Sequence, residues 1–90
     1  MPTFTILGFE GCGYYTAALK HLKDHKKTTG PTVEVVEHCY KRDHWPYILA
    51  NLAALPHFPS KAKSHKTSPL IFKDYKYVGG HDDLVKLLSL

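Results

Sequence analysis

The sequence TFTILGF, residues 3–9, runs directly into EGCGYY, residues 10–15, and this junction decides the fold. The first stretch is apolar and rich in β-favouring residues, which predicts a buried strand. Gly11 and Gly13 follow it at once, and glycines at this spacing indicate a tight turn. We therefore expect a strand that passes through a short turn into the next element.

A helix is expected next, because Tyr15, Leu19 and Leu22 recur at helical spacing while lysines occupy the opposite face. It should end at residues 28–31, TTGP, where glycine can end a helix and proline cannot continue one. Residues 32–38 contain three valines and predict a second strand. Such a strand–helix–strand unit pairs its strands in parallel, with a right-handed crossover.

A second helix is predicted after Asp43, which we expect to be its cap. Its buried face would consist of Trp45, Ile48, Leu49, Leu52 and Ala53, with Pro46 in its first turn and Pro56 and Pro59 beyond its end. Residues 57–68 carry three lysines and few apolar side chains, which predicts an exposed basic loop.

The last third of the chain predicts a hairpin and a helix. Residues 69–72 and 76–78 are short apolar runs that indicate antiparallel strands, and the glycines at 79–80 end the second of them. A third helix beginning at His81 or Asp82 would turn Leu84, Val85, Leu87 and Leu88 inward. The order βαβαββα predicts one α/β domain over residues 1–90, a four-stranded mixed sheet flanked by three helices.

The composition narrows the class of protein. Hydrophobic residues make up 43% of the 90 residues, enough for one small core, and two cysteines cannot supply a multi-disulfide framework. No apolar stretch approaches the ~20 residues of a membrane span. The net charge is a modest +4, and the lysines lack interleaved aromatic side chains that would stack on bases. We expect a soluble cytoplasmic protein with neither a nucleic-acid nor a membrane partner.

Cys12 is the residue best suited to carry chemistry. It stands where the first strand hands over to the first helix, and unpaired backbone N–H groups at a helix start favour a thiolate. Gly11 and Gly13 would leave the sulfur open to approach. The alternative is a small residue that fills a corner between strand and helix.

Three motifs in this order resemble the glutaredoxin family. They are Cys12-Gly13-Tyr14-Tyr15 at the start of the first helix, Thr67-Ser68-Pro69 before the third strand, and Val78-Gly79-Gly80-His81-Asp82-Asp83 before the last helix. The resemblance covers essentially the whole chain and implies a thioredoxin-like fold with Cys12 as the nucleophile. It also implies glutathione as co-substrate.

The resemblance further implies a glutathione site. In the family, the proline that matches Pro69 is cis, and the backbone of the preceding residue, here Ser68, pairs with the cysteinyl part of glutathione. A trans proline that begins an edge strand is the alternative. Lys66 matches the residue that faces the glycine carboxylate, although it could equally be a solvated lysine. His81 and Asp82 match the positions that hold the γ-glutamyl end, and Asp82 could also cap the helix.

Two departures from the family pattern affect the chemistry. Tyr15 stands where many glutaredoxins have a second cysteine, so the mechanism must be monothiol. Phe9 stands where many have Lys or Arg, which removes a charge next to the nucleophile. We expect reduction of glutathionylated proteins or small disulfides by a monomer. Alternatives are a glutathione-binding module with little catalysis, and a dimer that binds a [2Fe–2S] cluster through Cys12 and glutathione.

The other candidate ligands carry weaker indications. Cys39 follows the second strand and could be a distant resolving thiol, but a buried or semi-exposed bystander is the simpler interpretation. His21 and His25 have a spacing that can chelate a metal, yet no third ligand is evident, so we expect a solvated helix face and no metal site. His44, His57 and His65 share no spacing that indicates a site.

Overall fold

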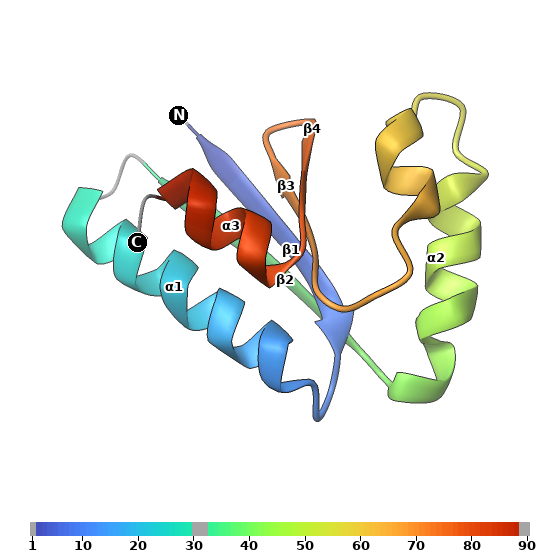
Figure 1. The fold of residues 1–90 in the computed structure, drawn as a ribbon, viewed down its shortest axis with the longest axis horizontal. Coiled ribbons are helices and arrows are strands. Elements are labelled where there is room, and N and C mark those ends of the chain that lie inside the picture. The colour runs from blue at the N-terminus through green and yellow to red at the C-terminus, as the bar shows by residue number, and fades with distance from the viewer. Residues whose placement is uncertain (1, 30–32, 89–90) are drawn as a thin grey trace.

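The computed structural model describes residues 2–29 and 33–88 of the chain, and Figure 1 shows their arrangement. The elements are β1 (Thr3–Phe9), α1 (Gly13–Thr29), β2 (Glu34–Tyr40), the 3₁₀ turn η2 (Arg42–His44), α2 (Trp45–Ala53), the 3₁₀ turn η3 (Ser60–Ser64), β3 (Leu70–Lys73), β4 (Lys76–Gly79) and α3 (His81–Leu88). This order confirms the predicted βαβαββα succession, with two short 3₁₀ turns added.

The four strands form one mixed sheet in the order β2-β1-β3-β4. β1 and β2 are parallel, with Thr3 opposite Glu34 and Phe9 opposite Tyr40. β3 runs antiparallel to both β1 and β4. β1, the strand that enters the turn before Cys12, is therefore central and paired along both edges, which makes it a rigid support for that turn.

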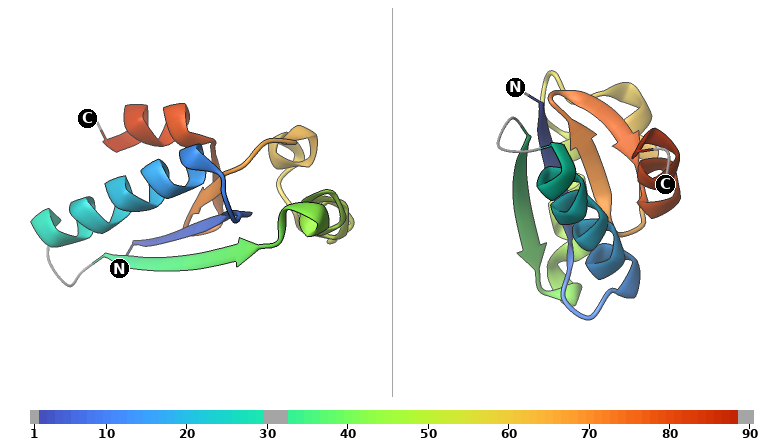
Figure 2. Two further views of the ribbon diagram at one scale, coloured as in Figure 1. Left: turned by 90° about the horizontal axis from the view of Figure 1, so that it is seen from below. Right: turned by 90° about the vertical axis from the view of Figure 1, so that its left-hand side faces the viewer.

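The sheet separates two hydrophobic clusters, because successive side chains of a strand point to opposite faces. Phe4 and Ile6 of β1 pack with Leu22 of α1 and Leu84 of α3 on one face. Leu7 of β1 packs with Trp45 and Leu70 on the other face, together with partly buried side chains of α2. Figure 2 shows α1 and α3 together on one side of the sheet. The sheet is thus covered by helices on both faces, as predicted.

The second helix differs from the prediction at its start. Asp43 lies inside the turn η2 and caps nothing, because the helix begins at Trp45 and its N-cap residue, His44, makes no side-chain capping bond. Pro46 stands in the first turn, as expected. The helix ends at Ala53, before either proline. Most of its predicted inward face is only partly buried, and Trp45 alone is fully buried.

Two further predictions were wrong in part. The expected basic loop at residues 57–68 contains η3, in which Ala62 is only 2% exposed. The short side chain of Ala62 fits beneath the turn while its lysine neighbours remain in solvent. In α3, Leu87 is 45% exposed, because an eight-residue helix presents one narrow stripe to the sheet and Leu84 occupies its centre. The predicted stop at Gly30 and Pro31, and the strand start at Thr32, lie outside the described residues.

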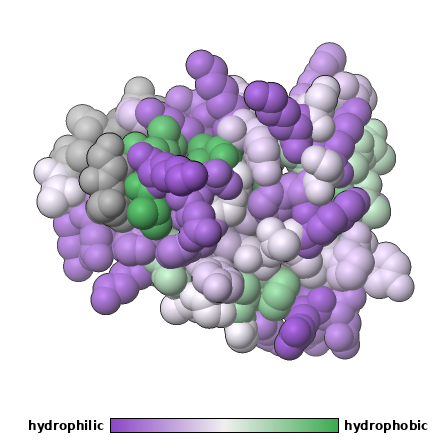
Figure 3. Space-filling model, in the orientation of Figure 1, coloured by the Kyte–Doolittle hydropathy of each residue, from purple (hydrophilic) through white to green (hydrophobic). Residues whose placement is uncertain are grey.

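On the face seen in Figure 3, hydrophilic residues predominate and the hydrophobic ones are confined to small patches. Within the described residues, none of the helices has the length and apolar character needed to cross a membrane.

Candidate functional site

Cys12 occupies the capping position of α1. Its carbonyl oxygen accepts hydrogen bonds from the Thr16 backbone N–H at 3.1 Å and from the Thr16 hydroxyl at 3.2 Å, so the helical bonding pattern begins at the cysteine. Gly11, just before it, has φ +80°, a conformation that glycine adopts without strain. The thiol is partly exposed, packs against the cluster around Leu22, and is not in a disulfide. The strand-to-helix junction therefore presents a free thiol at a helix start, as predicted.

The Ser68–Pro69 segment lies against this thiol. The peptide bond between the two residues is cis, which confirms the expectation from the family resemblance. The Cys12 thiol points at the Ser68 carbonyl oxygen at 3.7 Å, and the Ser68 hydroxyl accepts the Phe9 backbone N–H at 3.4 Å. Ser68 thus contacts both Cys12 and Phe9, although it lies more than fifty residues after them in the sequence.

A pocket of about 240 Å³ opens beside this junction. It is lined by Tyr14, Thr67, Ser68, Gly80, His81 and Asp82. All three sequence motifs contribute to this one wall, although the first and the last are separated along the chain by more than sixty residues. Three of the predicted glutathione contacts, Ser68, His81 and Asp82, therefore lie together.

Comparison with known proteins bears on the fold. No family model and no curated protein sequence matches the chain. Among solved structures, Escherichia coli glutaredoxin superposes with a TM-score of 0.61 at 18% sequence identity, covering 97% of this chain and 93% of that one. The chain has the glutaredoxin fold. At this identity the likeness concerns the fold, and the chemistry rests on the residues described here.

Tyr15, which stands in the position of a second cysteine, is built into the core of this glutaredoxin-like domain. It is 6% exposed, and its ring covers Gly8 of β1 so closely that a side chain at Gly8 would collide with it. Burial, with smaller contributions from Cys39 and Glu37, raises the pKa of the Tyr15 phenol to about 12. The phenol therefore stays protonated at neutral pH, and its part in the site is to pack beneath the junction.

The start of α3 is organised by a carboxylate that the sequence reading did not single out. The Gly80 backbone N–H donates to Asp83 Oδ2 at 3.2 Å, which is the reach-back half of a capping box. Gly79 has φ +129°, and a side chain there would collide with Asp83. The alternative role of Asp82 as the cap is therefore taken by Asp83. Asp82 is exposed instead and lies 3.1 Å from His81 Nδ1.

Lys66 is not part of the small pocket. It is exposed and borders a neighbouring hollow of about 280 Å³, together with Trp45, Pro46 and Leu49 of α2. The structure also places a cation beside Phe9, because the Arg42 guanidinium lies 5.5 Å from the centre of the Phe9 ring. Arg42 precedes α2 in η2, and no motif in the sequence linked it to Phe9.

The remaining cysteine and histidines occupy distinct places. Cys39 is exposed on β2, which corrects the expectation of a buried or semi-exposed thiol, and it pairs with Gly8 across the parallel ladder. His21 and His25 are partly buried, which corrects the prediction of a solvated helix face: His21 lies against the His81 ring and His25 against Phe4. Among the described residues, no three His, Cys, Asp or Glu side chains gather in a way that could hold a metal ion.

The residue that sequence reasoning missed is His65. Both of its ring nitrogens are engaged, one with the Pro69 carbonyl and one with the Tyr77 hydroxyl. The only sequence signal was its place four residues before Pro69, inside a stretch that composition marked as a loop.

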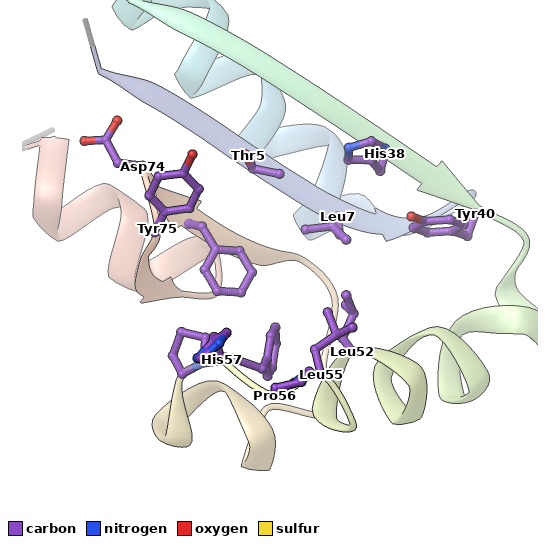
Figure 4. A pocket seen from close by; sticks show the side chains of 13 residues that line it. Thr5, Leu7, His38, Tyr40, Leu52, Leu55, Pro56, His57, Asp74 and Tyr75 are labelled. Atoms are coloured by element: carbon purple, nitrogen blue, oxygen red, sulfur yellow. The ribbon is translucent and has the colours of Figure 1, made fainter.

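A second hollow lies on the α2 face of the sheet. It measures about 640 Å³, and Figure 4 shows Leu7 and Tyr40 on the sheet opposite Leu52 and Leu55. None of the predicted glutathione contacts lines it. It is separated by the sheet from the cluster against which Cys12 packs.

Proposed function

We propose that this chain is a glutathione-dependent thiol–disulfide oxidoreductase that reduces protein–glutathione mixed disulfides through Cys12 by a monothiol mechanism. The observation that carries the proposal is the position of the Cys12 sulfur, 3.7 Å from the Ser68 carbonyl oxygen and next to a pocket that Ser68 also lines. A partly exposed thiol beside a pocket with backbone groups in its wall suits a substrate whose sulfur is part of a short peptide.

The proposed reaction has two exchange steps. The Cys12 thiolate attacks the glutathione sulfur of the mixed disulfide, a Cys12–glutathione disulfide forms, and the protein thiolate leaves and takes up a proton. The thiolate of a second glutathione then attacks the glutathione sulfur bound to Cys12. This releases the Cys12 thiolate and glutathione disulfide, so each turnover consumes one free glutathione, which leaves joined to the glutathione that the substrate carried.

Binding of the tripeptide would be divided among three places. The Ser68 backbone would pair with the cysteinyl part beside Cys12. His81 and Asp82 at the start of α3 would hold the γ-glutamyl end, since a helix N-terminus offers free N–H groups to a carboxylate. Lys66 lies in the neighbouring hollow, so it would meet the glycine carboxylate only if the tripeptide extends across the Thr67–Ser68 segment. An extended tripeptide has its two carboxylate ends apart, which agrees with this spread.

The test is the reduction of a glutathionylated peptide by glutathione, coupled to glutathione reductase and followed by loss of NADPH absorbance. The wild-type protein should turn over, and Cys12→Ser should abolish turnover. Cys39→Ser is the matched control, because it removes the other thiol at an exposed position outside the pocket, and it should leave the rate unchanged. Loss of turnover in the Cys39 variant alone would contradict the proposal.

The same purified protein also tests the two alternative functions, which are [2Fe–2S] cluster binding and glutathione binding without catalysis. A [2Fe–2S] cluster would need ligands from outside the chain, because Cys12 is the one thiol beside the pocket and no ligand group of three gathers in the described residues. A brown protein that absorbs in the visible range and runs as a dimer would favour that function. Glutathione binding without turnover, in a colourless protein, would indicate a non-catalytic glutathione-binding module.

A further inference from the structure

His65 is partly buried and contacts the segment Thr67–Pro69. Thr67 and Ser68 of this segment line the small pocket. Its Nε2 is 2.9 Å from the Pro69 carbonyl oxygen and 3.3 Å from the Thr67 hydroxyl. Its Nδ1 is 2.7 Å from the Tyr77 hydroxyl on β4. A methyl group placed on Gly80, which lines the pocket, would lie 3.8 Å from the ring of His65. The imidazole thus contacts the segment Thr67–Pro69 and β4, and it lies next to Gly80 at the start of α3.

The partners determine how the ring is protonated. A backbone carbonyl can only accept a hydrogen bond, so Nε2 must carry the hydrogen that Pro69 receives. In the neutral ring Nδ1 is then an acceptor, and the Tyr77 hydroxyl must donate to it. The bonds to Pro69 and Tyr77 thus each have one direction, and the ring cannot rotate without losing both. The Thr67 hydroxyl, at 3.3 Å, can share the hydrogen on Nε2.

Tyr77 is suited to remain a donor. Burial, with a smaller contribution from Asp83, raises the pKa of the Tyr77 phenol. Asp83 also accepts the Gly80 N–H at the start of α3. The contacts therefore run from α3 and β4 through His65 to the backbone that follows Ser68.

We propose that His65 is a positioning residue, which holds the Thr67–Ser68–Pro69 segment in place for glutathione through its Nε2–H bond to the Pro69 carbonyl. The inference rests on the proposed function, because glutathione is the ligand that this segment would bind. Ser68 stands between the two anchor points of the segment, and its carbonyl lies 3.7 Å from the Cys12 sulfur. A shift of the segment would therefore weaken binding more than it would alter the sulfur chemistry.

Two substitutions separate the roles of the two ring nitrogens. The amide of glutamine in His65→Gln reaches about as far as Nε2 and can still donate to the Pro69 carbonyl. The shorter amide of His65→Asn reaches only the position of Nδ1, so it keeps the contact with Tyr77 and loses the one with Pro69. His57→Asn changes an exposed histidine outside the small pocket and serves as the control.

The kinetic result expected is a rise in KM for the glutathionylated peptide of about three- to tenfold in His65→Asn, the range of one lost hydrogen bond. kcat should stay within about twofold, and His65→Gln should recover most of the affinity. Equal KM values in the Asn and Gln variants would overturn the proposal, because a role in packing alone does not distinguish the two nitrogens. Thermal unfolding of each variant shows whether it is folded.

A direct measurement covers the case in which a variant fails to fold. In the wild-type protein, long-range ¹H–¹⁵N correlation spectra of the ring should show His65 as the neutral tautomer with hydrogen on Nε2. Hydrogen on Nδ1 alone would overturn the proposal, because the unprotonated Nε2 and the Pro69 carbonyl would then both be acceptors.

Binding measured without chemistry separates this inference from the proposed function. Three proteins are compared, all of which carry Cys12→Ser: one keeps His65, one carries His65→Asn and one carries His65→Gln. The affinity of each for reduced glutathione is measured from the changes in the NMR chemical shifts of the Thr67 and Ser68 backbone amides. Weakened binding in the Asn variant alone, with no turnover by the wild type, would refute only the oxidoreductase function. Normal turnover with equal binding in all three would refute only the role of His65.

Discussion

The substitution Gly8→Ala tests whether Tyr15 and Ser68 are packed directly onto β1. Gly8 is buried in the central strand at an ordinary backbone conformation, so alanine introduces no backbone strain. A β-carbon at this position would lie 2.1 Å from Tyr15 Cδ2 and 2.6 Å from the Ser68 hydroxyl oxygen. Carbon atoms in contact normally stand about 3.5–4.0 Å apart, so the ring must move by more than an ångström.

The expected cost follows from that displacement. Overpacking of a well-packed core typically costs about 1–3 kcal/mol, and Tyr15 is enclosed by other buried side chains, which places the substitution toward the upper end. For a domain of this size each kcal/mol corresponds to roughly 4–8 °C in Tm. We expect a loss of about 2–3 kcal/mol in the free energy of unfolding and a Tm lower by about 10–20 °C.

The assay is urea unfolding followed by far-UV circular dichroism, with Gly13→Ala as the control. Nothing lies within 4 Å of a β-carbon at Gly13, so that substitution should be neutral or slightly stabilising. In a Tyr15→Ala background the collision with the ring disappears, and Gly8→Ala should then cost less by at least about 1 kcal/mol. A Gly8→Ala protein within about 0.5 kcal/mol of wild type would refute the described packing.

Two further predictions concern the core and the buried phenol. Leu84→Ala should lower the free energy of unfolding by about 2–5 kcal/mol, because Leu84 is fully buried. Leu87→Ala should change it by less than about 1 kcal/mol, because Leu87 is 45% exposed. Urea unfolding measures both, and equal losses would contradict the assigned orientation of α3. Titration of tyrosine absorbance near 295 nm should show one phenol ionising at about pH 12, and Tyr15→Phe should remove that step. Because the unfolded chain releases this proton near pH 10 and the folded chain only near pH 12, stability should fall as the pH rises through that window, and a Tyr15 that titrates at its ordinary value would contradict its burial.

Elements with a local signal could be predicted from the sequence. The apolar run of β1 and the glycines after it predicted the strand and the turn before Cys12, because strand burial and turn formation depend on residues within a few positions of one another. The resemblance of three motifs to glutaredoxin located Cys12, Ser68, His81 and Asp82. It also anticipated the cis peptide at Pro69.

Only the tertiary structure decided which residues meet. Lys66 and Ser68 are two residues apart, yet Lys66 borders the hollow beside α2 while Ser68 lines the small pocket. Arg42 reaches Phe9, and His65 connects Pro69 to Tyr77, through contacts that no spacing in the chain announces. The physical reason is that hydrogen bonds and ring contacts depend on the register of the sheet and on the direction of each side chain. Both are fixed by packing between elements that are distant in sequence.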